Sequence, residues 1–421
     1  MPQNGTRIQL EYYRQGDEAA RMLPIAVEEW EQAARERLAA GPFGYVAGGA
    51  GAGDTMRANL QAFQRWSLLP RVCHDISKRE LGVELFGRRH PLPFLLAPIG
   101  VLSILHPQAE LPAARAMGDA ERWFQLYPPK DRELTTSFLQ RAEAAGYAAI
   151  VVTLDSTLLG WREQDLRNAY LPFLSGQGMG SYFTDPVFRA KLGHPPEEKL
   201  EAAVQRALDE GNNTCLTWEQ IRFIREQTKL PLLLKGITHP EDAALALEHG
   251  VDGIIVSNHG GRQLDGAVAT LDALPAVCAT VRGRVPVLLD SGIRRGADVI
   301  KALALGASAV LLGRPYAYAL AVAGEKGVKA VIDHLAAQVE LQMAIAGRSS
   351  IRQLDRSVLS RPAPAGGRSR ASHQAWAGVV ALPEARPGWL RFRRPGRGCG
   401  TCSGLALPVQ TGVVTPPQTN L

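Results

Sequence analysis

From Pro93 onward, seven short apolar runs alternate with amphipathic stretches. Uninterrupted apolar runs of this kind are typical of strands in a parallel sheet, because helices cover such strands on both faces. Several of the intervening stretches have helical spacing and end in glycine, a frequent helix terminator. The alternation predicts an α/β fold assembled from β-α units. The seven runs are residues 93–100, 122–127, 148–155, 231–237, 252–258, 285–292 and 309–314.

The number of runs is one short of a closed barrel. A TIM (β/α)8 barrel closes on eight strands, and its eight β-α units occupy about 250 residues, or roughly 30 each. Between the first two runs, residues 101–121 have room for one helix and no further strand. We therefore expect a TIM (β/α)8 barrel that lacks its second β-α unit, so that two strands have lost the neighbour between them.

The chain divides into three parts by pattern and composition. Residues 1–92 are predicted to form an N-terminal helical and cap segment, with its helices interrupted at residues 39–54. Residues 93–359 form the predicted barrel, which carries a long insertion at about 172–217. The segment 360–421 is predicted to be a disordered tail, because eight prolines and nine glycines fall within the last 61 residues.

The formal net charge of +6 comes from the tail alone. The last 61 residues carry eight arginines, no lysine and one acid, whereas the rest of the chain carries 39 basic and 40 acidic side chains. A barrel with balanced charge has no electrostatic footprint for nucleic acid, so we expect no nucleic-acid partner. Non-specific RNA binding by the tail is the weaker alternative.

No apolar run is long enough to span a membrane, and the first 20 residues lack the apolar core of a secretory signal. We therefore expect a cytoplasmic protein with no membrane partner. The five cysteines are scattered and do not frame a disulfide scaffold. Cys399 and Cys402 form a lone C-x-x-C without a second pair, so we expect no metal site.

Hydrogen-bonding and charged side chains follow six of the apolar runs at their C-terminal ends. In a barrel, this is the end that carries the chemistry. A single polar residue there would mean little, but six strand ends in succession are hard to explain by core packing. The pattern predicts an active site at this end. The residues are Gln125, Tyr127, Thr153, Asp155, Lys235, Ser257, His259, Asp290, Gly313 and Arg314.

The last two runs end in DSGIRRGAD and GRPY, and each is followed by a predicted helix. Gly292 and Gly313 allow the backbone to approach a ligand closely, while Arg294 and Arg314 can donate charge-assisted hydrogen bonds. Such a pair of strand-helix junctions predicts a phosphate site, which barrels often place after the seventh and eighth strands. Each motif alone leaves open that the glycines only shape turns.

The stretch SNHGGRQLD follows a buried run and combines a base with a cation. A histidine oriented by a carboxylate serves as a general base near neutral pH, which suits His259 and Asp155. Arg162 and Arg262 can bind a carboxylate in bidentate fashion. Lys235 is either a Schiff-base nucleophile or a fixed cation beside an anionic cofactor. The plainer alternative is that the histidine satisfies a turn and the arginines are solvated.

The stretches FQLY, LLLKGI, SNHGGRQLDGAVATLDALP and DSGIRRGADVIKALALGASAVLLGR together resemble the FMN-dependent α-hydroxy-acid oxidase and dehydrogenase family. The similarity extends from the N-terminal helical segment to about residue 359, with the motifs in the family's order. The resemblance implies an FMN-binding barrel that oxidises an L-2-hydroxy acid to the 2-oxo acid. It also implies a homo-oligomer, since relatives are often tetramers.

The resemblance implies a role for each matching position. His259 takes a proton from the substrate, Asp155 pairs with it, and Tyr127 hydrogen-bonds the substrate hydroxyl. The substrate carboxylate is expected at Tyr45, Arg162 and Arg262. The expected FMN contacts are Pro98, Ile99, Gly100, Gln125, Thr153, Lys235, Ser257, Asp290, Gly292, Arg294, Gly313 and Arg314.

The stretches TLLGWREQDLRNAYLPFL and LAPIGVLSILHP, with the long insertion, resemble the branch that contains lactate 2-monooxygenase. The branch implies L-lactate as substrate, oxygen as acceptor and a lid over the site. A lid that retains pyruvate beside hydrogen peroxide would give acetate, carbon dioxide and water. If the lid opens early, pyruvate and hydrogen peroxide leave instead.

Two alternatives to an active enzyme of this branch follow from the sequence. The family's second strand ends in a serine or threonine near the flavin, and this chain lacks it. On the first alternative, the chain is an inactive or unstable truncated paralogue that has lost flavin binding. Another FMN barrel, such as type 2 isopentenyl-diphosphate isomerase, shares the phosphate motif, but the two candidate carboxylate-binding arginines argue against it.

Overall fold

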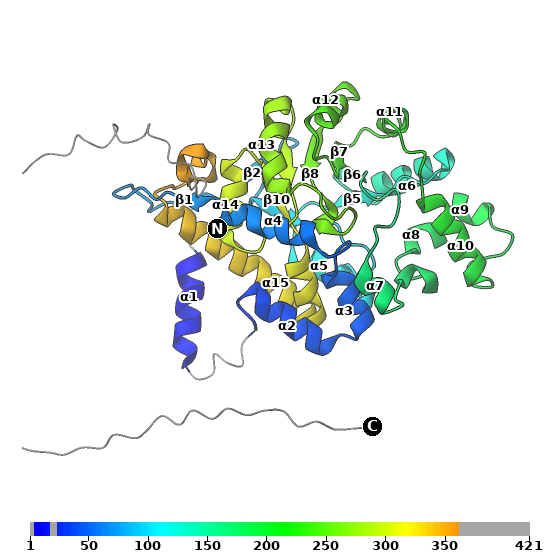
Figure 1. Ribbon diagram of the computed structural model, residues 1–421, viewed down its shortest axis with the longest axis horizontal. Helices are drawn as coiled ribbons and strands as arrows, with labels where there is room; N and C mark the ends of the chain where they lie inside the picture. The colour runs from blue at the N-terminus through cyan, green and yellow to red at the C-terminus, as the bar shows by residue number, and fades with distance from the viewer. Residues whose placement is uncertain (1–3, 17–22, 362–421) are drawn as a thin grey trace, which may run out of the picture. The chain divides into compact units, whose positions relative to one another are not determined.

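Seven strands form one parallel sheet in the order β4-β10-β9-β8-β7-β6-β5 (Figure 1). The computed structural model describes residues 4–16 and 23–361. Each strand falls within one of the seven predicted runs, which confirms the α/β prediction. The strands are β4 (Phe94–Leu96), β5 (Trp123–Leu126), β6 (Ala149–Thr153), β7 (Leu232–Lys235), β8 (Gly253–Val256), β9 (Val287–Leu289) and β10 (Ala309–Leu312).

The sheet is a curled barrel wall that stays open between β4 and β5. β4 pairs with β10, with Phe94 opposite Val310, and β5 pairs with β6, with Trp123 opposite Ala149. These are the two ends of the sheet, and the described residues place no strand between them. The chain passes from β4 to β5 through a short turn, η2 (Leu102–Ile104), and one helix, α5 (Leu111–Ala116). The prediction of a barrel without its second β-α unit is therefore confirmed.

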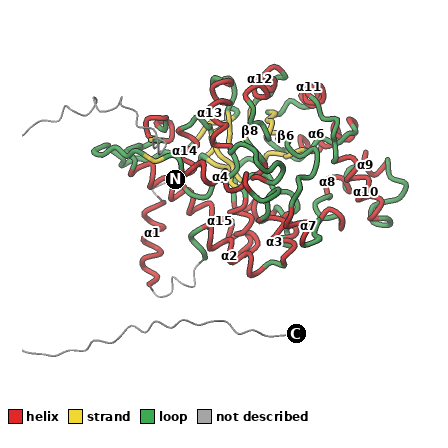
Figure 2. The backbone as a smooth tube through the Cα atoms, in the orientation of Figure 1, coloured by secondary structure: helices red, strands yellow, loops and turns green. Residues whose placement is uncertain are grey.

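Helices lie outside the strands, as the tube in Figure 2 shows. Glycine in the left-handed region follows two of them, Gly250 (φ 70°) after α12 and Gly306 (φ 112°) after α14, and lets the chain turn back to the next strand. The strands facing these helices are buried along their whole length, as a parallel sheet requires. The outer helices are α6 (Arg132–Ala144), α11 (Trp218–Gln227), α12 (Pro240–Glu248), α13 (Thr270–Val281), α14 (Gly296–Ala304) and α15 (Arg314–Ile345).

The N-terminal segment is helical, as predicted, but the expected interruption at residues 39–54 holds a helix of its own. This helix, α3, spans Ala40–Ala47 despite containing two glycines and a proline. Its neighbour α2 packs along α15. The segment comprises α1 (Asn4–Gln15), α2 (Val27–Arg37), α3 and α4 (Asp54–Gln64).

A hairpin of β2 (Val83–Leu85) and β3 (Arg88–His90) covers the N-terminal end of the barrel sheet. Its turn residue Phe86 packs edge-on against Trp123, the first residue of β5, with ring centroids 5.6 Å apart. The two short strands β1 (Ser67–Leu68) and β11 (Leu359–Ser360) pair antiparallel and join the end of the described chain to the N-terminal segment. The hairpin thus packs at the N-terminal end of the sheet, opposite the C-terminal ends of the strands.

The long insertion contains η3 (Pro172–Ser175), α8 (Gly180–Phe183), α9 (Pro186–Ala190) and α10 (Leu200–Gly211). Asp185 is fully buried and ties it to α6, because its Oδ2 accepts hydrogen bonds from Ser137 Oγ at 2.8 Å and Arg141 Nη1 at 3.0 Å. At its other end the insertion reaches the N-terminal segment, where Phe173 lies edge-on to Tyr45, with ring centroids 6.4 Å apart. The insertion therefore runs from the outside of the sheet to the neighbourhood of Tyr45.

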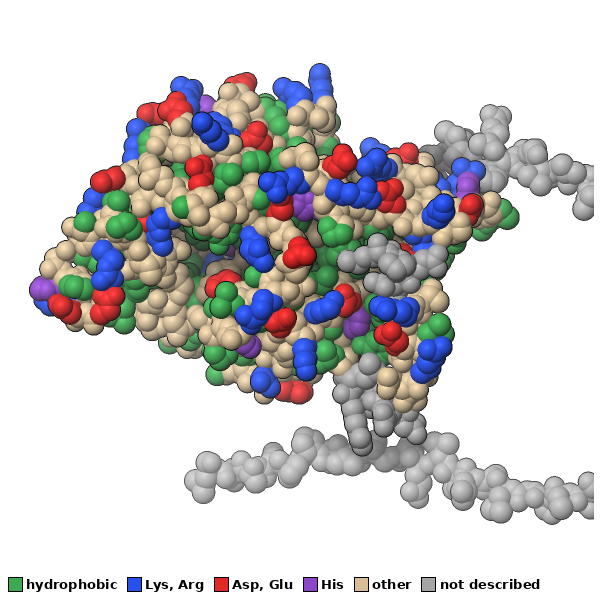
Figure 3. All heavy atoms as spheres, turned by 180° about the vertical axis from the view of Figure 1, so that it is seen from behind, with side chains coloured by type: hydrophobic (Ala, Val, Ile, Leu, Met, Phe, Trp, Pro, Cys, Tyr) green, Lys and Arg blue, Asp and Glu red, His purple; other side chains and the backbone are tan. Residues whose placement is uncertain are grey.

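On the face shown in Figure 3, Lys and Arg side chains lie among Asp and Glu side chains rather than in a separate area. Within the ranges 4–16 and 23–361, no helix is both long enough and apolar enough to cross a membrane. The predicted tail lies outside the described residues from position 362 onward.

Candidate active site

The polar residues predicted at the strand ends meet at one end of the sheet. Thr153, the last residue of β6, is opposite Lys235, the last residue of β7. Gln125 Nε2 on β5 donates to Thr153 Oγ1 at 3.0 Å, and Lys235 Nζ donates to Ser257 Oγ at 3.0 Å. Parallel pairing thus produces a continuous row of polar side chains across four neighbouring strand ends.

Lys235 is the buried cation at the centre of this row, with 3% of its surface exposed. Its ammonium lies 3.4 Å from Asp290 Oδ2, at the end of β9. Burial alone would lower the pKa of Lys235, but attraction to Asp290 and Asp155 raises it above its ordinary value. The side chain is therefore held as a fixed cation and is a poor nucleophile, which favours the second of its two predicted roles.

His259 and Asp155 form a pair across the row. His259 Nδ1 lies 2.8 Å from Asp155 Oδ1, and Ser156 Oγ lies 3.1 Å from the same nitrogen. Burial, reinforced by the charge of Lys235, lowers the pKa of His259 even though Asp155 acts in the opposite direction. The imidazole is therefore neutral at neutral pH and available to accept a proton.

Asp155 is ionised in this arrangement. Burial opposes its charge, but Lys235 and the hydrogen bond from His259 hold the pKa of Asp155 below its ordinary value. Its Oδ1 also accepts a hydrogen bond from Ser156 Oγ at 3.2 Å, while its Oδ2 is buried without a hydrogen-bond partner among the described residues. With Asp155 charged, the Nδ1 of His259 carries the proton, so Nε2 is the free basic nitrogen.

Two arginines and a tyrosine face one another beside this pair. The guanidinium of Arg262 lies 5.0 Å from the ring centre of Tyr45, and that of Arg162 lies 5.8 Å from it. Burial, together with the nearby charges of Arg162 and Arg314, lowers the pKa of Arg262 to about 9. Three cations so close together, with little acid between them, favour the binding of an anion.

Arg162 offers an unused donor to such an anion. Its side chain is almost completely buried, and its Nη1 has no hydrogen-bond partner within the described part of the chain. Asp165 Oδ2 lies 3.8 Å from Nη1, beyond hydrogen-bond distance, and burial raises the pKa of Asp165 despite both arginines. An unsatisfied buried guanidinium nitrogen is costly without a ligand, which makes this corner a candidate carboxylate site.

The predicted phosphate residues lie at the ends of β9 and β10. α15 begins at Arg314, directly after Gly313, and the only described atom within 4 Å of a Cβ added at Gly313 is Ala97 Cβ, at 4.0 Å. Arg314 donates to the carbonyl oxygens of Val46, Gly48 and Gly260 at 2.8–3.0 Å, and burial lowers its pKa to about 10. The helix start, the open space beside Gly313 and the buried cation together suit a phosphate group.

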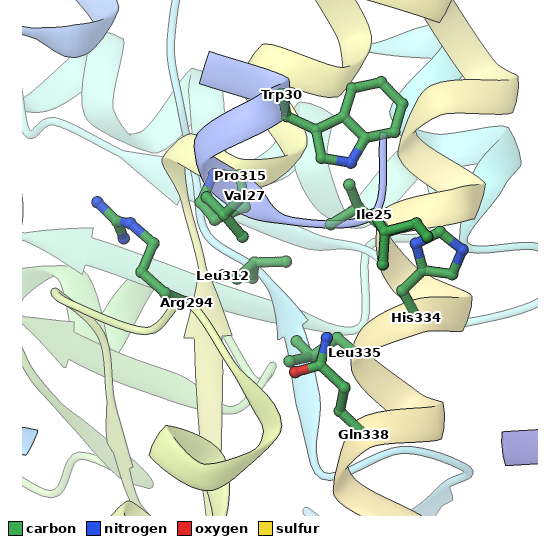
Figure 4. A pocket seen from close by; sticks show the side chains of 10 residues that line it. Ile25, Val27, Trp30, Arg294, Leu312, Pro315, His334, Leu335 and Gln338 are labelled. Atoms are coloured by element: carbon green, nitrogen blue, oxygen red, sulfur yellow. The ribbon is translucent and has the colours of Figure 1, made fainter. Parts of the chain in front are cut away.

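Arg294 is the second buried cation of this end. Its Nη1 donates to its own neighbour's carbonyl, Ile293 O, at 2.9 Å, and burial lowers its pKa. Its stem borders a cavity of about 10 Å³ between α2 and α15, and Figure 4 shows the guanidinium extending away from Trp30 and His334. The guanidinium of Arg294 therefore does not point into this cavity. Nearby Gly292 has φ 94° and lies so close to Asn59 O that a Cβ would be 2.8 Å from it.

The residues after β4 complete the row at one open end. Pro98 and Ile99 are partly buried and Gly100 is exposed. Apart from its chain neighbours, no described atom lies within 4 Å of where a Cβ would sit on Gly100. At the other open end, Tyr127 follows β5 and is 40% exposed. Tyr127 nevertheless lies near the predicted polar cluster, since Lys235 and Asp155 both act on its electrostatics. The strands β4 and β5 themselves are not paired.

Sequence reasoning missed three residues of the site. Ser156 and Asp165 follow Asp155 and Arg162 closely in the chain, and that proximity was the available signal. Gln263 lies inside the quoted stretch SNHGGRQLD and hydrogen-bonds both Asp155 O and Arg162 Nη2. Its partners are more than 100 positions away, so no local pattern identifies it.

Comparison with known proteins agrees with this geometry. The family model of the FMN-dependent dehydrogenases matches residues 34–121 and 116–361, two segments that meet between α5 and β5, where the β-α unit is missing. The L-lactate oxidase of Lysinibacillus sphaericus (strain C3-41) is 44% identical over 355 residues, covering 79% of this chain and 91% of that protein. An FMN-dependent alpha-hydroxy acid dehydrogenase of Penicillium citrinum is 39% identical over 389 residues, covering 86% of this chain and 97% of that protein.

Two solved structures have the same fold. A mandelate oxidase with (S)-2-phenylpropionate has a TM-score of 0.69 and 36% identity, covering 80% of this chain and 98% of its own. An oxidized active mutant of (S)-mandelate dehydrogenase has a TM-score of 0.72 and 34% identity, covering 80% and 100%. The chain therefore belongs to the FMN-dependent dehydrogenase family, with FMN as its cofactor and the oxidation of α-hydroxy acids as its chemistry.

Proposed function

We propose that this protein oxidises L-lactate to pyruvate with oxygen as the electron acceptor. The observation that carries the proposal is the placement of the His259–Asp155 pair beside two buried arginines. A base next to a carboxylate site is what a 2-hydroxy acid needs, because its hydroxyl and its carboxylate lie on adjacent carbons. The similarity to an L-lactate oxidase supports a small substrate.

In this proposal His259 is the general base. Nδ1 donates to Asp155 Oδ1, which fixes the ring and leaves Nε2 to accept a proton from the substrate. Asp155 then stabilises the imidazolium, since its carboxylate is held ionised by Lys235 and by the histidine itself. Tyr127 is assigned to the substrate hydroxyl. Bound FMN supplies the two-electron acceptor for the oxidation.

The substrate carboxylate is assigned to Arg162, Arg262 and Tyr45. The free Nη1 of Arg162 supplies one charge-assisted hydrogen bond, and Arg262 supplies the second cation. Burial and then repulsion from Arg162 and Arg314 lower the pKa of Arg262, and an anion here would relieve the repulsion. Binding of the substrate carboxylate therefore also stabilises the charged form of Arg262.

The cofactor residues divide by chemistry. Lys235 is a fixed cation for negative charge on the flavin ring, with Gln125, Thr153 and Ser257 as hydrogen-bonding neighbours. Pro98, Ile99 and Gly100 line the open space after β4. Asp290, Gly292, Arg294, Gly313 and Arg314 are assigned to the ribityl chain and the phosphate, which matches two buried cations at the starts of α14 and α15.

The fate of pyruvate depends on the insertion at residues 172–217. We assign this segment as a lid, because its Phe173 already contacts Tyr45 at the candidate carboxylate site. If it retains pyruvate and hydrogen peroxide together, the products are acetate, carbon dioxide and water, as in a lactate 2-monooxygenase. We further propose residues 1–92 as cap, 93–359 as barrel and 360–421 as tail, and a tetramer as the assembly.

A specific observation favours a second candidate, an inactive chain that does not retain flavin. The sheet is open between β4 and β5, and each of these end strands lacks a sheet partner on one side. At the start of β5, Trp123 Nε1 is buried without a hydrogen-bond partner among the described residues. The open edge is expected where a neighbouring strand is missing, and the unpaired indole nitrogen adds a cost at the start of β5.

The visible absorption spectrum of the purified full-length chain separates these two candidates. A flavin spectrum that bleaches when L-lactate is added anaerobically, and that D-lactate leaves unchanged, supports the oxidase. Product analysis after admitting oxygen then distinguishes pyruvate with peroxide from acetate with carbon dioxide. If the protein is still colourless after incubation with excess FMN and removal of the unbound FMN, the inactive candidate is established instead.

A further inference from the structure

One side-chain amide connects the two loops that supply the candidate base and the candidate carboxylate site. Gln263 Nε2 donates to the carbonyl oxygens of Asp155 at 2.9 Å and Leu158 at 2.8 Å. Gln263 Oε1 accepts from Arg162 Nη2 at 2.8 Å and from Gly160 N at 3.4 Å. Both N–H groups and the oxygen of the amide are therefore hydrogen-bonded, and all four partners belong to one loop, residues 155–162.

The partners fix the orientation of the amide. Two carbonyl oxygens can only accept, so they face the NH2 group, while the arginine and the backbone N–H can only donate, so they face the oxygen. The loops are also in close contact elsewhere. Arg162 Nε donates to Arg262 O at 3.1 Å, and a Cβ on Gly160 would lie 2.6 Å from Gln263 O. Within the described part of the chain, Gln263 is thus a side chain that hydrogen-bonds both ends of the loop.

We propose that Gln263 is a positioning residue that sets the placement of Asp155 and Arg162 together, and thereby couples proton acceptance by His259 to binding of the substrate carboxylate. The proposal rests on the function proposed above. At one end, the hydrogen bond to Asp155 O holds the backbone that carries the partner of His259. At the other end, the hydrogen bond to Nη2 holds Arg162 so that its Nη1 stays free.

Two substitutions separate the two ends. In Gln263→Glu, a carboxylate oxygen still faces Arg162, but the two donors to Asp155 O and Leu158 O are replaced by an acceptor. In Gln263→Met, a side chain of similar length keeps the packing and removes every hydrogen bond. Gln32→Met is the matched control, because Gln32 is an exposed glutamine whose side chain bonds only Glu36 on its own helix.

Steady-state kinetics with L-lactate measure the effects of the two substitutions on KM and on kcat separately. We expect Gln263→Met to raise KM roughly tenfold and to lower kcat by a similar factor, since Arg162 and Asp155 both lose a hydrogen bond. Gln263→Glu should lower kcat while its KM stays within about threefold of the unsubstituted protein, because the contact to Arg162 is retained. Gln32→Met should match the unsubstituted protein in both constants. Equal effects of Gln263→Glu and Gln263→Met on KM would overturn the assignment to Arg162.

Amide hydrogen exchange gives a readout that does not require activity. On the full chain, both Gln263 variants should speed exchange in residues 155–162 relative to the outer helix α12, which serves as an internal reference. Unchanged exchange in this loop overturns the inference whether or not the chain oxidises L-lactate. Failure of the unsubstituted, FMN-loaded chain to be reduced by L-lactate would overturn the proposed function instead, so the two failures are distinguishable.

Discussion

The imidazole Nδ1 of His259 lies 2.8 Å from Asp155 Oδ1, although 104 positions separate the two residues in the chain. The distance is set by the sheet, because Asp155 follows β6 and His259 follows β8, and the strand between them, β7, ends in Lys235. The C-terminal ends of three adjacent strands thus bring a carboxylate, a cation and a base together. The missing β-α unit lies elsewhere in the order, between β4 and β5, so it leaves this trio intact.

Replacing the base should abolish flavin reduction without removing the flavin. In His259→Ala, the group that accepts the substrate proton is lost, and we expect the rate of anaerobic reduction by L-lactate to fall by about 10² to 10⁴. Stopped-flow absorption of the flavin measures this rate, and the ratio of flavin to protein absorption reports the bound cofactor. His74→Ala is the matched control, since His74 is exposed. Undiminished reduction in His259→Ala would remove the histidine from the mechanism.

The pH dependence of kcat/KM should reflect the lowered pKa of His259. Burial and Lys235 depress this pKa below its ordinary value of 6.5, and the base works only when unprotonated. Activity is therefore retained as pH falls to 6.5 and is lost only below it. In Asp155→Asn, the interaction that raises the histidine pKa is gone, so the acid limb should move to still lower pH while kcat decreases. An acid limb above pH 6.5 in the unsubstituted protein would contradict the electrostatic account.

Removing a carboxylate-binding arginine should weaken substrate binding more than it slows the chemical step. A charge-assisted hydrogen bond contributes roughly 1.5–3 kcal/mol, so Arg162→Met should raise KM for L-lactate about 10- to 150-fold. The inhibition constant of oxalate, a substrate-like dicarboxylate, should rise in parallel. Arg57→Met is the control, because Arg57 is on the exposed side of α4 and bonds Ala52 O. A KM that stays unchanged while kcat falls would place Arg162 outside the carboxylate site.

The strands and the polar cluster could be predicted from sequence because both depend on local patterns. Apolar runs gave all seven strands, and the position of a residue at a strand end places it at the mouth of the sheet. Helix α3 could not be predicted in this way, since glycine and proline disfavour helix locally. The structure shows why glycine is there: a Cβ on Gly41 would lie 2.7 Å from the ring of Tyr170, and one on Gly44 would lie 2.5 Å from Asn168 Nδ2.

The bridging role of Gln263 and the attachment of the insertion were beyond sequence reasoning for the same physical reason. Gln263 meets Asp155 across 108 positions, and Asp185 meets Ser137 across 48. Contacts at such separations are decided by the folded arrangement, and a single sequence carries no periodic signal for them. The shortened barrel was the exception, because a missing unit changes the spacing between neighbouring runs and can therefore be counted.

Restoring the second β-α unit should stabilise the chain and its hold on FMN. Inserting a β-α unit of roughly 30 residues between α5 and β5 would give β4 and β5 a common neighbour and pair their free backbone groups. Each kcal/mol gained raises Tm by roughly 2–4 °C in a domain of about 150–250 residues and by less in a longer chain, so an increase of a few degrees is expected.

A Gly/Ser linker of equal length at the same position is the control for this insertion, since it adds chain without a strand. The melting temperature and the ratio of bound FMN to protein are measured for the three chains side by side. A rise in both quantities with the strand, but not with the linker, would show that the open edge between β4 and β5 limits the natural chain. Equal stability, with bound FMN close to one per chain in all three, would show that α5 and the surrounding side chains already close the barrel well enough to hold the cofactor.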